Sequence, residues 1–218
     1  MWAVVPLKSP ETAKSRLAPT LSATQRRELF FLMARHVLQT LRATPGISEV
    51  AVVTSSDDVA RLAQDYRARV IRQLADAGTA QAFSAAISDL RPLQLDRVLL
   101  ISGDLPLLST AAVTTLLAAR ARGAGVVVGP DRRRIGTNAL LCAPPDALAP
   151  CFGANSFAKH VALARDHGVS TTTLELDELA LDLDDAEDLE YLRHRLPRTS
   201  DLRWKLGTSA PLAAAGAR

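Results

Sequence analysis

The stretch RVLLISGDLPLL, residues 97–108, contains the pattern that decides the fold. Its four consecutive apolar residues, Val98–Ile101, predict a strand over Arg97–Asp104 that is buried on both faces. A Gly-Asp-Leu-Pro turn ends this strand. Such strands are typical of a parallel sheet covered by helices on both sides, so we expect Asp104 at the carboxyl end of a central strand.

Strand and helix patterns alternate along the rest of the chain. We expect further strands over Trp2–Leu7, Ser48–Ser55, Val70–Ile71, Gly125–Pro130, Thr137–Ala143 and Val169–Leu176. We expect helices from Ser22, after a cap at Asp57, and over Ala80–Leu90, Ser109–Arg122, Asn155–His167 and Asp185–Arg195. This alternation predicts one α/β domain over residues 1–196, with a mainly parallel central sheet and helices on both faces, and a loose tail over 197–218.

The composition excludes several classes of function. The chain has 218 residues, 48% hydrophobic and 22% charged, as expected for one globular domain. Its net charge of +3 comes from scattered Lys and Arg, and aromatic residues make up only 4%, so we expect no nucleic-acid partner. No apolar run approaches the ~18 residues of a membrane span, and no signal-peptide pattern is present, so we expect no membrane partner and a cytoplasmic protein.

Polar groups that follow the strands are the candidates for a site, because ligands bind beyond the carboxyl ends of the strands in such sheets. Lys and Arg hold phosphate oxygens, and carboxylates hold a hard cation such as Mg²⁺. The layout therefore predicts a site for a magnesium-bound nucleoside triphosphate, and the sequence lacks the P-loop motif, so binding follows another mode. The candidate groups after the first, third and fourth strands are Lys8, Lys14, Arg16, Asp76, Gly78 and Asp104.

Three carboxylates are candidate magnesium ligands. Asp182 and Asp184 alternate with leucines, so in an extended segment both carboxylates face one side, as sharing a cation with Asp104 requires. Each has a structural alternative. Asp104 could cap the helix that starts near Ser109, and Asp182 and Asp184 could cap the helix from Asp185.

The basic residues also have two interpretations. Lys8, Lys14 and Arg16 either clamp phosphates or form a solvated basic loop. The run Arg132–Arg134 is more typical of a solvated loop, with one member reaching an anionic substrate as the alternative. We expect no catalytic histidine, because the helical histidines have no Ser, Cys or Asp partner that the sequence identifies.

Four blocks of the sequence together resemble a known family. They are VVPLKSPETAKSRLAP (4–19), LLISGDLPLL (99–108), GTNALL (136–141) followed by FGANSFAKH (152–160), and LDLDDAEDL (181–189). The chain resembles the 2-phospho-L-lactate guanylyltransferase family, which includes versions that use phosphoenolpyruvate or 3-phospho-D-glycerate. The resemblance runs from Trp2 to Leu192. It implies a nucleotidyltransferase fold of the nucleotide-diphospho-sugar transferase type and the transfer of GMP from GTP to the acid's phosphate, with Mg²⁺ and release of pyrophosphate, in coenzyme F420 biosynthesis.

The resemblance also implies residue roles. Lys14, Arg16 and Asp104 would be catalytic. The other implied contacts are Lys8, Lys14 and Arg16 with the GTP phosphates, Asp76 and Gly78 with the guanosine side, Thr137, Gly153 and Ser156 with the phosphorylated acid, and Asp104, Asp182 and Asp184 with Mg²⁺.

Two other functions fit the same fold class. A nucleotidyltransferase of the molybdenum-cofactor type usually has a glycine-rich first loop, whereas this loop reads KSPETAK (8–14). A non-catalytic nucleotide sensor could dispense with the carboxylates, yet all three are present. The sequence leaves open which acid is the acceptor and the oligomeric state, with a homodimer as one option.

Overall fold

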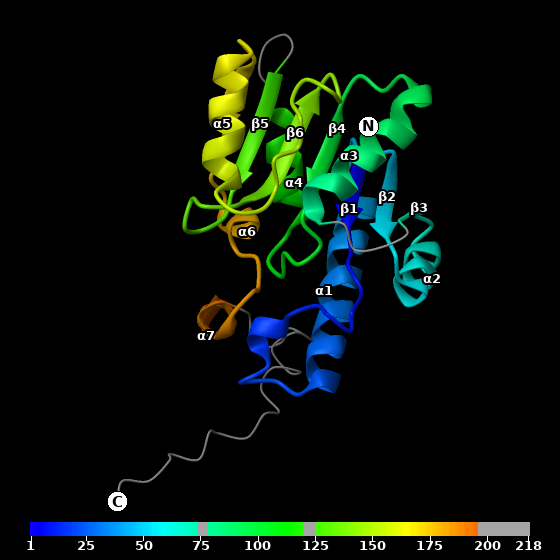
Figure 1. Cartoon of the computed structure of the whole chain (residues 1–218), viewed down its shortest axis with the longest axis vertical. Coiled ribbons are helices and arrows are strands. Elements are labelled where there is room, and N and C mark those ends of the chain that lie inside the picture. Colours follow the sequence, from blue (N-terminus) through cyan, green and yellow to red (C-terminus); the bar gives the residue numbers. More distant parts are fainter. Residues whose placement is uncertain (74–77, 120–124, 196–218) are drawn as a thin grey trace, which may run out of the picture.

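The computed structural model describes residues 1–73, 78–119 and 125–195. Its central sheet has seven strands in the order β3-β2-β1-β4-β6-β5-β7 (Figure 1). All neighbouring strands are parallel except β6, which is antiparallel to both β4 and β5. The predicted mainly parallel sheet is therefore confirmed. The strands are β1 (Trp2–Pro6), β2 (Glu49–Thr54), β3 (Arg69–Arg72), β4 (Val98–Ile101), β5 (Gly125–Pro130), β6 (Thr137–Ala143) and β7 (Ser170–Thr173).

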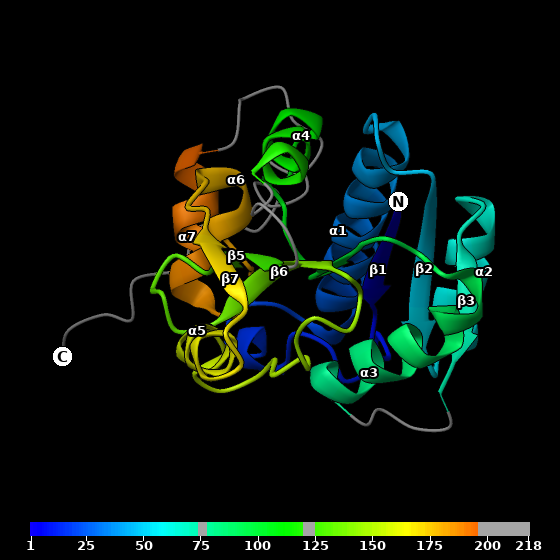
Figure 2. The same ribbon diagram turned by 90° about the horizontal axis from the view of Figure 1, so that it is seen from above.

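Helices cover both faces of this sheet, as predicted (Figure 2). Successive residues of β1 point to opposite sides: Ala3 and Val5 belong to one buried cluster, and Val4 belongs to the other. The first cluster includes residues of α1, α2 and α4, and the second includes residues of α3 and α5. The helices are α1 (Ala23–Ala43), α2 (Asp57–Asp65), α3 (Thr79–Leu90), α4 (Thr110–Ala118), α5 (Ser156–Asp166), α6 (Asp177–Ala180) and α7 (Ala186–Arg195), with short 3-10 turns η1 (Ser15–Leu17) and η2 (Arg91–Leu93).

Helix starts follow the sequence signals with one exception. Ser22 and Gln25 form the predicted reciprocal capping box of α1. The expectation that Asp57 caps α2 is wrong. Ser56 has extended backbone angles and its hydroxyl accepts from the Val59 N–H, so Asp57 is already the first helical residue.

Three expectations lie partly or wholly outside the described residues. The helix predicted over Ser109–Arg122 is described as far as Ala118, and residues 120–122 of that range are outside the described residues. Asp76 and the tail over 197–218 are also outside it. No helix in the described ranges combines the length and the apolar character that crossing a membrane requires.

A third apolar cluster joins the two ends of the described chain. Leu17 and Leu21 of the loop after β1 and Met33 of α1 pack with Leu183 and Leu189 from the segment around the start of α7. Figure 1 shows α7 beside this N-terminal loop, below the sheet in that view. This packing brings the loop that contains Lys14 next to the segment that contains Asp182 and Asp184.

Close packing at Gly103 fixes the turn after β4. A Cβ atom at this position would overlap Leu7 Cδ2 and lie 3.1 Å from Val5 Cγ1. Gly103 therefore lets the turn that holds Asp104 pack directly against the end of β1.

We expect Gly103→Ala to lower the free energy of unfolding by about 1–3 kcal/mol, because buried side chains must move to admit the methyl group. Urea unfolding measures this change. In a Leu7→Ala background, which removes the crowding methyl groups, the same substitution should cost clearly less. An equal cost in both backgrounds would contradict this account of the packing.

Candidate active site

Lys14 joins two carboxylates at the carboxyl edge of the sheet. Its Nζ lies 2.5 Å from Asp104 Oδ2 and 3.0 Å from Asp184 Oδ1. Both carboxylates therefore contact the same ammonium group, although Asp104 and Asp184 are 80 residues apart in the chain. The Lys14 backbone is left-handed (φ 58°), an uncommon conformation for a residue other than glycine.

The electrostatics of this cluster follow from burial and like charge. The Lys14 side chain is only 6% exposed. Its burial by itself lowers the pKa, but Asp104 and Asp184 outweigh this effect and raise the pKa of Lys14, so it stays charged. Asp182 has a raised pKa, first because it is buried and then because Asp104 and Asp184 add negative charge. One ammonium group thus pairs with two carboxylates, and the charge of both acts on the third, Asp182.

Asn138 of β6 fixes the segment that contains Asp182. Its Nδ2 donates to the Leu179 carbonyl (2.9 Å) and to Asp182 Oδ1 (3.3 Å). The Leu183 N–H donates to the Asp104 carbonyl (3.3 Å), which holds the same segment against the turn after β4. Sequence reasoning missed Asn138. The available signal was a lone amide side chain inside the apolar strand TNALLCA.

The capping alternatives do not account for the carboxylates of Asp104 and Asp184. Ser109 caps α4, since its hydroxyl accepts from the Ala112 N–H (3.0 Å). At the start of α7, Asp185 accepts from the Asp188 N–H (3.0 Å), and Asp188 accepts in return from the Asp185 N–H (3.2 Å). The Asp104 and Asp184 carboxylates instead bond to Lys14.

The other basic candidates of the first loop lie on its surface. Lys8 and Arg16 are exposed and form no ion pair with any residue in the described ranges. Gly78 precedes α3 as its N-cap with φ 94°, which favours glycine. A ligand can therefore contact the charged groups of Lys8 and Arg16 and the backbone of Gly78.

The run Arg132–Arg134 lies in a loop where Arg133 and Arg134 are exposed, as the solvated-loop interpretation predicts, and it also forms ion pairs. Arg132 contacts Glu187 (3.2 Å) and Asp188 (3.3 Å), and Arg133 contacts Glu187 (3.0 Å). These contacts hold the first turn of α7 against the loop after β5. Sequence reasoning missed this role because the two segments are more than 50 residues apart.

The structure brings together Thr137, Gly153 and Ser156, the three residues predicted to contact the acid. The Thr137 N–H donates to Ser156 Oγ (2.8 Å), and the Ser156 N–H donates to the Gly153 carbonyl (3.1 Å). Gly153 has φ 118°, and among the described residues, apart from its two chain neighbours, no atom lies within 4 Å of where its Cβ would be. A fourth residue, His160, contacts the Thr137 hydroxyl (2.9 Å).

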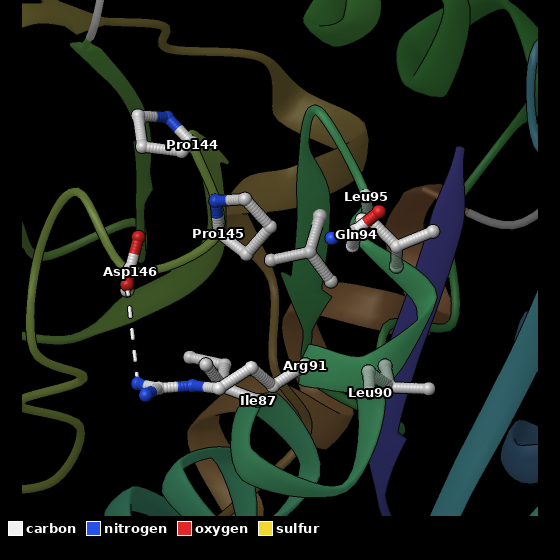
Figure 3. Close-up of a pocket in the computed structure, with 9 residues that line it drawn as sticks. Ile87, Leu90, Arg91, Gln94, Leu95, Pro144, Pro145 and Asp146 are labelled. Carbon is white, nitrogen blue, oxygen red and sulfur yellow. Dashed lines mark ion pairs between the residues drawn. The ribbon is translucent and has the colours of Figure 1, made fainter.

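A separate pocket lies at the other edge of the sheet (Figure 3). It measures about 160 Å³ and is lined by the end of α3, by Val98 at the start of β4 and by Pro145 after β6. Arg91 and Asp146, which also line it, form an ion pair (4.0 Å). Because Asp104 follows the opposite end of β4, this pocket is not part of the carboxylate cluster.

A family model for guanylyl transferases, CofC like, matches residues 1–197. The chain belongs to the CofC-like guanylyl transferase family. The predicted family and the predicted enzyme class, a nucleotidyltransferase that transfers a guanylyl group, are therefore confirmed.

Relatives with curated names support this membership. A phosphoenolpyruvate guanylyltransferase from Conexibacter woesei is 41% identical over 88% of this chain and 86% of its own length. A 2-phospho-L-lactate guanylyltransferase from Methanothermobacter thermautotrophicus is 32% identical, over 88% of this chain and 84% of its own. A 3-phospho-D-glycerate guanylyltransferase from Colwellia psychrerythraea is 31% identical, over 87% of this chain and 89% of its own.

Solved structures support the fold of this CofC-like chain. A structure assigned as a nucleotide-diphospho-sugar transferase from Desulfovibrio desulfuricans G20 superimposes with a TM-score of 0.77 at 17% identity. The match covers 94% of this chain and 93% of that one. The predicted nucleotide-diphospho-sugar transferase-like fold is confirmed.

We expect Asp182→Asn to raise the free energy of unfolding at pH about 8 and to change it little at pH about 4. The pKa of Asp182 is raised in the folded state, so the stability of the native chain falls as pH rises from the unfolded pKa through the folded one. The neutral amide removes this loss and still accepts from Asn138.

Urea unfolding in EDTA at both pH values measures the effect. Asp89→Asn is the matched control, because Asp89 is a half-exposed carboxylate paired with Arg69 on the surface. A gain at high pH no larger than that of the control would contradict the like-charge account of the cluster.

Proposed function

We propose that this chain transfers GMP from GTP to the phosphate of a small phosphorylated acid and releases pyrophosphate, with phosphoenolpyruvate as the favoured acceptor. The observation that carries the proposal is the pairing of Lys14 with Asp104 and Asp184, whose charges also act on Asp182, at the edge where such sheets bind ligands. The relatives support this acceptor, because the 41% identical one is named for phosphoenolpyruvate and those named for the other two acids are 31–32% identical.

The proposed transfer of GMP requires neutralisation of charge rather than a general base. A phosphomonoester has a second pKa near ~6, so the acceptor is mostly a dianion at neutral pH and needs no proton removed. The obstacle is that one anion must attack another at the α-phosphorus. Alignment of the two substrates and neutralisation of their charge therefore supply most of the catalysis.

The carboxylate cluster has the donor chemistry for Mg²⁺. No three acidic, His or Cys side chains in the described ranges lie together as a ready-made metal site. Lys14 instead supplies the positive charge that Asp104 and Asp184 require. Asp104, Asp182 and Asp184 would hold Mg²⁺ through a few carboxylate oxygens, with phosphate oxygens and water completing its shell. When bound, Mg²⁺ would offset the negative charge of the phosphates.

The basic residues of the first loop suit the triphosphate. Lys14 is held charged inside the cluster, where it can stabilise the charge that passes to pyrophosphate. Lys8 and Arg16 are exposed and available to the outer phosphates. Gly78, at the start of α3, would line the guanosine side, and Asp76, which lies outside the described residues, is proposed for the same side.

The phosphorylated acid would bind at the start of α5. Thr137 and Ser156 present hydroxyl groups there, and Gly153 leaves open space beside its backbone. The helix N-terminus adds a favourable field for an anion. We place the reaction in the cytoplasm, with a homodimer as one option for the oligomeric state.

We expect pyrophosphate release from GTP only when both an acid and Mg²⁺ are present, with the highest kcat/KM for phosphoenolpyruvate. A coupled pyrophosphate assay with phosphoenolpyruvate, 2-phospho-L-lactate and 3-phospho-D-glycerate tests this. EDTA should abolish release, and excess Mg²⁺ should restore it. GTP binding without pyrophosphate release for any acid would instead support a nucleotide sensor.

We expect Asp104→Asn to lower kcat by about a hundredfold or more, the usual cost of losing one charge contact in the transition state. The fold should survive, because Ser109 caps α4 and Asp184 still pairs with Lys14. Steady-state kinetics and circular dichroism measure both properties, with Asp89→Asn as the control. Near-normal kcat in a folded Asp104→Asn variant would show that Asp104 is not part of the site.

A further inference from the structure

His160 is a buried histidine that the proposed chemistry does not use. It lies in α5 with 0% of its surface exposed. Its ring packs edge-on against Phe152 (centroids 5.0 Å apart), and Phe152 packs against Phe83 of α3 (4.3 Å). The imidazole therefore has a fixed position between α5 and the loop that contains Gly153.

The hydrogen bonds of His160 determine its tautomer. The Cys151 backbone N–H donates to Nε2 (2.8 Å), and a backbone N–H can only donate, so Nε2 carries a lone pair. Burial lowers the pKa of His160 to about 4, against an opposing backbone hydrogen bond with Ser156, so the ring is neutral at neutral pH. The single ring proton is then on Nδ1, 2.9 Å from Thr137 Oγ1, and Nδ1 donates to that oxygen.

This tautomer sets the direction of the Thr137 hydroxyl group, and a backbone N–H sets that of the Ser156 hydroxyl group. Thr137 Oγ1 accepts from His160, so its own O–H is left to donate. Ser156 Oγ accepts from the Thr137 N–H (2.8 Å), so its O–H is left to donate as well. Neither hydroxyl donates to an acceptor in the described ranges, and the two residues are 4% and 1% exposed. Two buried donors side by side are satisfied by an oxyanion.

We propose that His160 is a positioning residue, which fixes the Thr137 hydroxyl as a donor to an oxyanion of the phosphorylated acid and holds the loop from Cys151 to Gly153 beside it. The inference rests on the proposed function, because the acid is the ligand that receives these donors. It assigns to His160 no contact with the substrate and no proton transfer.

Two substitutions separate the two hydrogen bonds of the imidazole. In His160→Gln, the amide oxygen can reach the place of Nε2 and keep the Cys151 bond, but the donor to Thr137 is lost. In His160→Asn, the amide nitrogen can occupy the place of Nδ1 and keep the donor to Thr137, but the Cys151 bond is lost. We expect His160→Gln to raise KM for the acid by about tenfold, the cost of about one hydrogen bond, with KM for GTP unchanged.

We expect His160→Asn to recover part of this loss. Thr137→Val removes the hydroxyl itself, so adding His160→Gln to Thr137→Val should raise KM for the acid no further. A merely structural role predicts instead that the two substitutions add, and that KM for GTP rises together with KM for the acid. Either of those results would overturn the inference.

A measurement on the unmodified protein covers the case in which a variant does not fold. Nitrogen-15 NMR of the imidazole should report a neutral ring with its proton on Nδ1 at neutral pH. A proton on Nε2, or a charged ring, would overturn the inference. If the unmodified protein releases no pyrophosphate with any of the three acids, the proposed function fails; if it is active and His160→Gln behaves like the unmodified protein, only the role of His160 fails.

Discussion

The structure depends on one buried ammonium group that pairs with carboxylates from two distant parts of the chain. Lys14 contacts Asp104 after β4 and Asp184 before α7, and its left-handed backbone turns the loop after β1 toward them. The leucine cluster beneath this loop brings the three segments together, and the ion pairs then fix which polar atoms meet. Burying a charge is costly unless it is paired, so the loop, the turn and the segment before α7 hold one another in place.

Repulsion among the carboxylates of the same cluster lowers the stability of the fold, and this cost indicates a functional role. Asp182 is half-buried and feels the charge of Asp104 and Asp184, and one lysine does not neutralise three carboxylates. A sequence selected for stability alone would place an apolar or neutral side chain there. Phosphoryl chemistry needs the opposite, a concentrated set of oxygen ligands and a nearby cation. The charge repulsion among these carboxylates therefore indicates a functional site at this edge of the sheet, and the family membership agrees with phosphoryl chemistry.

The fold could be predicted because its signals are local. Continuous apolar strands, the capping box at Ser22 and the turn after Asp104 each depend on adjacent residues. Candidate ligands could be predicted from their place after strands, whatever their final partners. The roles of Asn138 and His160 could not, because each depends on contacts between segments that only the folded sheet brings together. The pairing of Arg132 with α7 was missed for the same reason.

The chemistry of the acid subsite limits what it can distinguish. Phosphoenolpyruvate, 2-phospho-L-lactate and 3-phospho-D-glycerate all carry a phosphate and a carboxylate, and they differ in the carbon atoms between them. In the proposed subsite two hydroxyl donors would recognise an oxyanion that all three acids share, so they would supply affinity rather than discrimination. Discrimination would come from the space around the carbon chain, where the acids differ in shape and 3-phospho-D-glycerate alone carries a free hydroxyl group. In the described part of the subsite the shape of that space is set by the turn at Gly153 and Asn155, whose backbones both have positive φ. Substitutions in this turn should therefore change the ratio of kcat/KM values among the acids, whereas loss of a hydroxyl should weaken all three alike.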